Sequence, residues 1–95
     1  MARQLKVMGI CGTYDLDSAN GRMLEIVSKL LKDKGMEWVV WDNKETPLPF
    51  VGEEGCWSHP NVLKYKEMAE SVDAFVLSSP EYHGTMSGVM KNSLD

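Results

Sequence analysis

The most informative stretch of this chain reads Ala74-Phe75-Val76-Leu77-Ser78-Ser79-Pro80-Glu81-Tyr82-His83-Gly84-Thr85. Its apolar first half predicts a buried strand over residues 73–78, and the Pro and Gly that follow predict a tight loop. Loops at the carboxyl ends of strands form the ligand crevice of an open parallel sheet, so this loop is a candidate binding site. A helix is expected from about residue 86, where apolar residues recur at helical spacing: Met86, Val89, Met90 and Leu94.

The same alternation of strand and helix patterns extends back to the start of the chain. Residues 5–10 and 38–41 predict two further strands that are mostly apolar, as strands covered on both faces should be. Between them we expect a helix that is capped by Ser18 or Asn20 and stopped at Gly35. Its buried face is predicted from the apolar residues at a spacing of three or four: Met23, Leu24, Val27, Leu30 and Leu31.

A long irregular connection over residues 42–59 follows the second strand, and Pro60 suits the first turn of another helix. The order strand, helix, strand, helix, strand, helix predicts a parallel α/β sheet with right-handed crossovers. The chain ends at Asp95 inside a helical pattern, so we expect one domain over residues 1–95 that is incomplete at its C-terminus. The third strand would then keep a free edge without cover.

Composition and charge exclude several classes of protein. The 95 residues carry a net charge of −4 without a basic block, which argues against nucleic acid or an anionic membrane as the partner. The apolar runs, about five residues at most, are far too short for a membrane span. Residues 1–6 lack the apolar core of a secretory leader. With only Cys11 and Cys56, a reducing cytoplasm is the expected location.

The loop after the first strand carries side chains suited to a phosphate group. Thr13, Ser18 and Asn20 lie near the expected start of a helix, where free N–H groups and the helix dipole attract anions. The pattern is neither the dinucleotide GxGxxG nor a Walker loop. Simple capping of the helix by Ser18 and Asn20 is the alternative interpretation. Two carboxylates in the same loop, Asp15 and Asp17, oppose an anion.

The loop after the third strand is suited to a flat ligand. Pro80 fixes an extended entry, and Gly84 permits a positive φ or a close approach of the backbone. Tyr82 could lie against a planar ring while neighbouring backbone N–H groups meet its polar edge. The alternative is a tight strand-to-helix turn in which Tyr82 serves only for packing.

Other chemistry has little support in the sequence. Cys56 and His59 have a metal-like spacing, but a tetrahedral site needs further ligands, so no metal is expected. His83 has no obvious nucleophile beside it, and Ser78 and Ser79 lack the Gly-x-Ser-x-Gly elbow of a hydrolase. We therefore expect no catalytic side chain.

Residues 80–95 resemble the long signature of the NADPH-dependent FMN reductase family, which typically reads Pro-Glu-Tyr-(Asn/His)-Gly-Ser and continues to Gly-Val-Leu-Lys-Asn-Ala-Leu-Asp. Thr46-Pro47-Leu48-Pro49-Phe50 is similar to the family's Leu-Pro-x-(Phe/Tyr) segment. The resemblance covers nearly the whole chain, but only the N-terminal half of a usual member. It implies a flavodoxin-like, three-layer α/β/α parallel sheet, truncated after the third strand and the start of the third helix.

Carried over by position, the resemblance implies a binding site for FMN. Its phosphate would be held by Thr13, Ser18 and Asn20. The family usually has an Arg in the phosphate loop where this chain has Asp15. The isoalloxazine and ribityl groups would lie against one loop, made of Pro80, Glu81, Tyr82, His83 and Gly84.

The implied activity is that of an oxidoreductase, a cytoplasmic flavoprotein that uses NADPH or NADH. Hydride would pass from the nicotinamide to the flavin and on to a small-molecule acceptor such as a quinone, an azo dye, a metal oxyanion or free flavin. The family commonly forms dimers or tetramers, so we expect a homo-oligomer, with the helix over residues 88–95 as a candidate interface. An FMN-binding electron-transfer module without NAD(P)H activity, and a non-catalytic association module, remain alternatives. A response-regulator receiver is rejected because Ser78-Ser79-Pro80 supplies no acceptor Asp.

Overall fold

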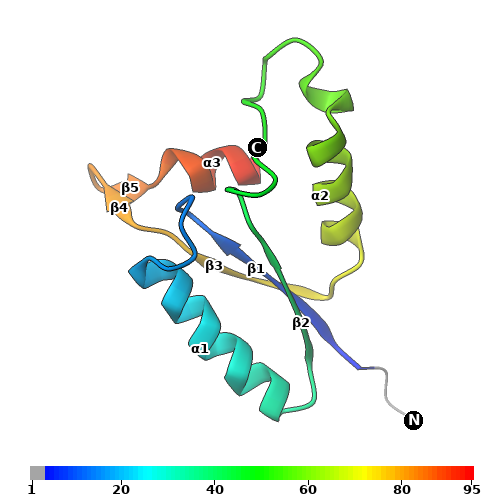
Figure 1. The fold of residues 1–95 in the computed structure, drawn as a ribbon, viewed down its shortest axis with the longest axis vertical. Helices are drawn as coiled ribbons and strands as arrows, with labels where there is room; N and C mark the ends of the chain where they lie inside the picture. Colours follow the sequence, from blue (N-terminus) through cyan, green and yellow to red (C-terminus); the bar gives the residue numbers. More distant parts are fainter. Residues whose placement is uncertain (1–3) are drawn as a thin grey trace.

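The chain folds around a sheet of three parallel strands, seen in a computed structural model that describes residues 4–95 (Figure 1). The strands β1 (Lys6–Cys11), β2 (Glu37–Trp41) and β3 (Ala74–Ser78) are arranged in the order β2-β1-β3. Residues 1–3 lie outside the described residues, and the prediction that residues 1–6 lack a secretory leader falls partly on them. The central position of β1 brings the loops after β1 and β3 to the same edge of the sheet.

In the described part of the chain, three α-helices form the two outer layers, and a short 3-10 helix, η1 (Cys56–Ser58), precedes α2. Helix α1 (Ala19–Asp33) packs on one face of the sheet. Helices α2 (Pro60–Glu70) and α3 (Gly88–Leu94) lie on the other face, as Figure 1 shows. The predicted three-layer, flavodoxin-like arrangement of a parallel sheet is therefore confirmed. Each of these helices is too short or too polar to cross a membrane, as far as residues 4–95 are concerned.

The main core lies between the sheet and helices α2 and α3. It is built around four buried side chains, and Tyr65 of α2 packs against them. Trp41 is 2% exposed, and its ring packs edge to face against the ring of Tyr65, with 5.1 Å between the ring centroids. Its Nε1 donates a hydrogen bond to Asn43 Oδ1. Burial of these apolar surfaces supplies most of the driving force that holds α2 and α3 on the sheet. The four core side chains are Met8, Ile10, Trp41 and Met90.

Local sequence signals place both ends of α1 and the start of α2 correctly. Of the two cap candidates, Ser18 is the N-cap of α1: its Oγ accepts from Gly21 N at 3.2 Å, whereas Asn20 lies inside the helix. Gly35 adopts a φ of 81° just after the helix ends, as a C-terminal stop requires. Pro60 opens α2 in the predicted way.

Two predictions of burial are wrong. Strand β3 was expected to be buried, yet Phe75 and Leu77 are about half exposed, because β3 is an edge strand of a three-stranded sheet. In α1, Met23 and Leu30 are more than half exposed. The apolar residues of α1 extend around more of the helix than the face that packs on the sheet, so some of them are exposed to solvent. The buried residues of α1 are Gly21, Leu24 and Ser28.

The hydroxyl of Tyr65 gives a testable pH dependence. It donates to Ser93 O at 2.8 Å, and burial raises the pKa of Tyr65 above its ordinary value of 10.0. Because the folded-state pKa is raised, this stabilisation is complete below pH 10 and is lost as the pH rises through the folded-state pKa. Tyr65→Phe should cost about 1 kcal/mol at neutral pH and flatten the alkaline decline in unfolding free energy. Urea unfolding at several pH values measures this effect, with Tyr14→Phe as the control because Tyr14 is exposed. If the unfolding free energy of both variants fell equally with rising alkaline pH, the role assigned to the Tyr65 hydroxyl would be refuted.

Candidate functional site

The loop that leaves β1 is held by hydroxyl groups at the start of α1. Its backbone is tied to the end of β3, where Gly12 N donates to Ser78 O at 2.7 Å. Thr13 Oγ1 lies 2.9 Å from Ser18 Oγ and donates to Asp15 O at 2.9 Å. The loop therefore folds back over the first turn of α1 and brings two hydroxyl groups to the positive end of the helix dipole.

The loop lies so close to α1 that only glycine fits beneath it. A Cβ atom added to Gly21 would lie 1.9 Å from Leu16 O and 2.4 Å from Leu16 C. Real Cβ atoms do not approach backbone atoms so closely, and the contact involves backbone rather than a flexible side chain. Gly21 therefore determines the path of the loop, and with it the positions of the Thr13 and Ser18 hydroxyls.

Asn20 connects the first loop to the end of β3. Its Oδ1 accepts from Ser78 Oγ at 2.8 Å, across 58 positions of sequence. This bond leaves Asn20 Nδ2 without a hydrogen-bond partner within residues 4–95. Together with the N–H groups of the first helical turn, this amide offers donors that an anion can use.

The charged side chains around the first loop are exposed. Asp15 Oδ1 accepts from Asp17 N at 2.9 Å in a local turn, so the carboxylate is turned toward its own backbone. Arg22 donates from Nε to Asp17 O at 3.0 Å and is also exposed. Two carboxylates and one guanidinium thus lie near the start of α1, and water screens them.

The loop after β3 forms a small hairpin before the helix begins. Strand β4 (Glu81–Tyr82) pairs with β5 (Thr85–Met86), joined by His83 and Gly84 at φ values of 53° and 81°. The expectation that Gly84 permits a positive φ is confirmed. The helix predicted from about residue 86 starts at Gly88 instead, because a two-residue turn with both φ positive closes a hairpin that includes Met86.

Ser87 ties the two loops together. It is 2% exposed, and its Oγ donates to Gly12 O at 2.6 Å while accepting from Met90 N at 3.1 Å. Its backbone N–H donates to Ser79 Oγ at 3.0 Å. One buried side chain therefore joins the loop after β1, the loop after β3 and the first turn of α3.

Removing this hydroxyl should loosen the site. Ser87→Ala leaves the Gly12 carbonyl and the Met90 N–H without their buried partner, which should lower the free energy of unfolding by about 1–3 kcal/mol. Ser58→Ala is the matched control, because Ser58 is exposed and its Oγ bonds only to a nearby backbone carbonyl. Equal unfolding midpoints in urea for the two variants would contradict the role assigned to Ser87.

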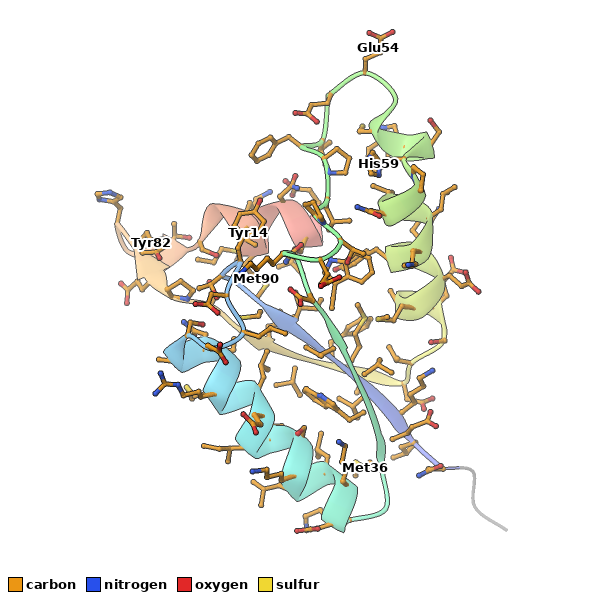
Figure 2. The ribbon with its side chains drawn as sticks, in the orientation of Figure 1. Tyr14, Met36, Glu54, His59, Tyr82 and Met90 are labelled. Atoms are coloured by element: carbon orange, nitrogen blue, oxygen red, sulfur yellow. The ribbon has the colours of Figure 1, made fainter. Side chains whose placement is uncertain are left out.

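A hollow of about 380 Å³ lies between the two loops, the connection after β2, and α3. Three exposed aromatic rings, of Tyr14, Phe50 and Tyr82, form part of its wall. Figure 2 shows Tyr14 and Tyr82 beyond the ends of the strands, on the side of the molecule where α3 lies. The complete lining consists of Gly12, Thr13, Tyr14, Asn43, Leu48, Phe50, Tyr82, Ser87, Gly88, Val89 and Asn92.

The predicted site residues are brought to this region but not into one pocket. Thr13 and Tyr82 line the same hollow, and Ser18 reaches it only through its contact with Thr13. Asn20 lies toward the end of β3. The remaining predicted residues belong to the entry and turn of the hairpin and do not line the hollow: Pro80, Glu81, His83 and Gly84.

Sequence reasoning missed several residues of the hollow. Leu48 and Phe50 belong to the segment Thr46-Pro47-Leu48-Pro49-Phe50, and its resemblance to a family segment was a usable signal for this part of the site. Asn43 gave none, because its place in the hollow depends on a distant partner. It accepts from Nε1 of the nearby Trp41, but it donates to Cys11 O, 32 positions away, at 3.4 Å. Within residues 4–95, no three metal-ligating side chains come together.

A parallel sheet covered on both faces, with polar loops meeting at its carboxyl edge, places the chain among flavodoxin-like α/β proteins. The chain belongs to the NADPH-dependent FMN reductase family, which matches residues 5–95.

Three relatives illustrate the similarity. The NAD(P)H:quinone oxidoreductase of Solanum tuberosum is 33% identical over 96% of this chain and 48% of its own length. The NADPH azoreductase of Bacillus sp. is 39% identical over 74% of this chain and 39% of its own length. The NAD(P)H-dependent FMN reductase of Pseudomonas aeruginosa is 30% identical over 100% of this chain and 51% of its own length. The chain thus spans about half the length of the curated relatives that align with it along almost all of its residues.

Proposed function

We propose that this chain binds FMN and acts as an NAD(P)H-dependent oxidoreductase on a small-molecule acceptor. The observation that carries the proposal is a pair of contacts, one within the loop after β1 and one from the first turn of α1 to the end of β3. Thr13 meets Ser18 at 2.9 Å, and Ser78 Oγ donates to Asn20 Oδ1 at 2.8 Å. Membership of the NADPH-dependent FMN reductase family, and the oxidoreductase names of the three relatives, support the same function.

The groups at the start of α1 fit the phosphate of FMN. Hydroxyls such as those of Thr13 and Ser18 can rotate to donate to phosphate oxygens, and Asn20 Nδ2 has no partner among residues 4–95. Helix α1, with 15 residues, is long enough to direct a dipole at the anion. Asp15 weakens the fit without closing the site, because its carboxylate is exposed and turned toward Asp17 N.

The hairpin loop would hold the ring system. Backbone N–H groups of the loop would meet the polar edge of the isoalloxazine, and the half-exposed ring of Tyr82 would lie against it. Bound FMN supplies the hydride-transfer chemistry, so the protein needs no acid or nucleophile of its own. The residues proposed to lie against the ring and its ribityl chain are Pro80, Glu81, Tyr82, His83 and Gly84.

A second candidate function is an FMN-binding electron-transfer module without NAD(P)H activity. It requires only the two loops described above, which the contacts of Asn20 with Ser78 and of Ser87 with Gly12 hold together. We also propose that the chain forms a homo-oligomer, which the exposed apolar side chains on α1 and β3 support. Two cysteines without a disulfide support a cytoplasmic location. Light scattering with and without FMN tests the oligomer.

Consumption of NADPH by the FMN-loaded chain tests the proposed function. We expect the chain with FMN to oxidise NADPH faster in the presence of a quinone than FMN alone does. FMN binding without NADPH consumption would select the electron-transfer module. A chain that neither binds FMN nor consumes NADPH would contradict both functions.

A further inference from the structure

We propose that a second copy of this chain docks on the outer side of helix α1, with the two α1 helices lying antiparallel. This dimer rests on the homo-oligomer proposed above, gives it a defined interface and needs no bound FMN. Among residues 4–95, α1 is the only α-helix on its face of the sheet, so its outer side is not covered by another helix (Figure 1).

The outer side of α1 carries a stripe of large apolar side chains. Met23, Ile26 and Leu30 are 61%, 60% and 57% exposed. Their spacing of three and four positions places them on one side of the helix, opposite the residues that α1 buries against the sheet. Exposed apolar side chains that are grouped in this way are typical of a surface that contacts another protein.

Charged side chains flank this stripe in an order that suits a second copy of α1. At 100° per residue, the four that lie nearest to the stripe on one flank are Arg22, Glu25, Lys29 and Asp33. Their signs alternate along the helix, from positive at Arg22 to negative at Asp33. An antiparallel copy presents the same row in reverse, so Arg22 faces Asp33 of the second copy and Glu25 faces Lys29. A parallel copy would place like charges side by side.

The same antiparallel alignment also matches the apolar side chains. Met23 of one copy lies beside Leu30 of the other, and the two Ile26 side chains meet near the two-fold axis. One patch thus serves both copies, which closes the assembly as a dimer. Because the stripe is only about 10 Å long, the interface is small, and we expect reversible, concentration-dependent association.

The ion pair of Glu25 with Lys29 would become part of a larger network in this dimer. Within one helix, Lys29 Nζ lies 3.8 Å from Glu25 Oε1, and both side chains are exposed. In the dimer, each of the two would also face its opposite on the second copy, which makes a network of four charges. Networks contribute more than isolated surface pairs, which are worth little.

Sedimentation of the full chain over a range of concentrations tests the apolar part of the interface. We expect the wild type to dimerise, and Ile26→Glu to raise the dimer Kd at least about 100-fold, because two carboxylates would meet at the centre. Leu63→Glu is the matched control, because Leu63 lies in α2 and is 54% exposed. A monomeric wild type, or equal weakening by both substitutions, would overturn the proposal. So would a dimer that Phe75→Glu dissociates and Ile26→Glu does not, because it would place the interface on β3.

Two charge reversals test the orientation of the helices. Glu25→Lys and Lys29→Glu each make like charges meet across the dimer, so each should raise the dimer Kd roughly fivefold at low salt. An equal mixture of these two variants should associate as well as the wild type, because every facing pair in the mixed dimer again has opposite signs. A mixture that associates no better than either variant alone would refute the antiparallel pairing.

FMN titration of the same proteins keeps this test apart from that of the proposed function. Ile26→Glu should bind FMN as the wild type does, because Ile26 lies outside the two loops proposed to hold the cofactor. A chain that dimerises through α1 without binding FMN would refute the proposed function and leave the interface standing. A chain that binds FMN and stays monomeric would do the reverse.

Discussion

Replacement of Gly21 by alanine should destabilise the chain by about 3 kcal/mol or more and abolish FMN binding. The added Cβ would lie 1.9 Å from the Leu16 carbonyl oxygen, and that oxygen belongs to backbone that cannot move without shifting the whole loop. The displaced loop carries Thr13 and Ser18, so the same change removes the proposed phosphate donors. Urea unfolding and FMN titration measure the two effects.

Gly88→Ala is the control for this experiment. Gly88 is the first residue of α3, and a Cβ there would meet no atom within 4 Å. Alanine should therefore be neutral or stabilise the helix by up to about 1 kcal/mol. A Gly21→Ala chain as stable as Gly88→Ala would show that the loop after β1 does not pack on α1 as described.

Asp15→Arg should tighten FMN binding roughly 30-fold at low salt, because it removes one negative charge and adds a positive one beside a dianionic phosphate. Asp15 is exposed, and within residues 4–95 its carboxylate accepts only the local hydrogen bond from Asp17 N, so the fold should tolerate the change. Binding is measured by quenching of flavin fluorescence. Riboflavin, which lacks the phosphate, should show little change.

Asp33→Arg is the control that separates the effect of a charge near the phosphate from the effect of net charge on FMN affinity. It makes the same change of charge in the last turn of α1, far from the loop after β1. Its effect on FMN affinity should be small and should vanish at high salt. Equal tightening by Asp15→Arg and Asp33→Arg, or equal tightening of riboflavin, would contradict a phosphate site at the start of α1.

Short-range signals made much of the fold predictable. The cap at Ser18, the stop at Gly35 and the proline at the start of α2 each depend on one or two residues and on local backbone geometry. Burial was less predictable, because it depends on neighbours. Phe75 is apolar and lies in a strand, but its exposure follows from the position of β3 at the edge of the sheet.

The candidate site was predictable only where a side chain and its hydrogen-bond partner are close in sequence. Thr13 and Ser18 are five positions apart, and their contact could be anticipated from a loop that leads into a helix. The buried bond of Ser87 to Gly12, 75 positions away, carries no such signal. The hairpin over residues 81–86 was missed because the strong helical spacing that follows it concealed two very short strands.

Titration of the full chain with FMN, followed by flavin fluorescence and compared with Asn20→Ala and Tyr82→Ala, tests most directly whether the two loops form one binding site. We predict saturable quenching by the wild type, weaker FMN binding by both variants, and weaker riboflavin binding by Tyr82→Ala alone. Flavin fluorescence that stays unchanged as the wild-type chain is added, or FMN affinity that neither substitution alters, would contradict the account.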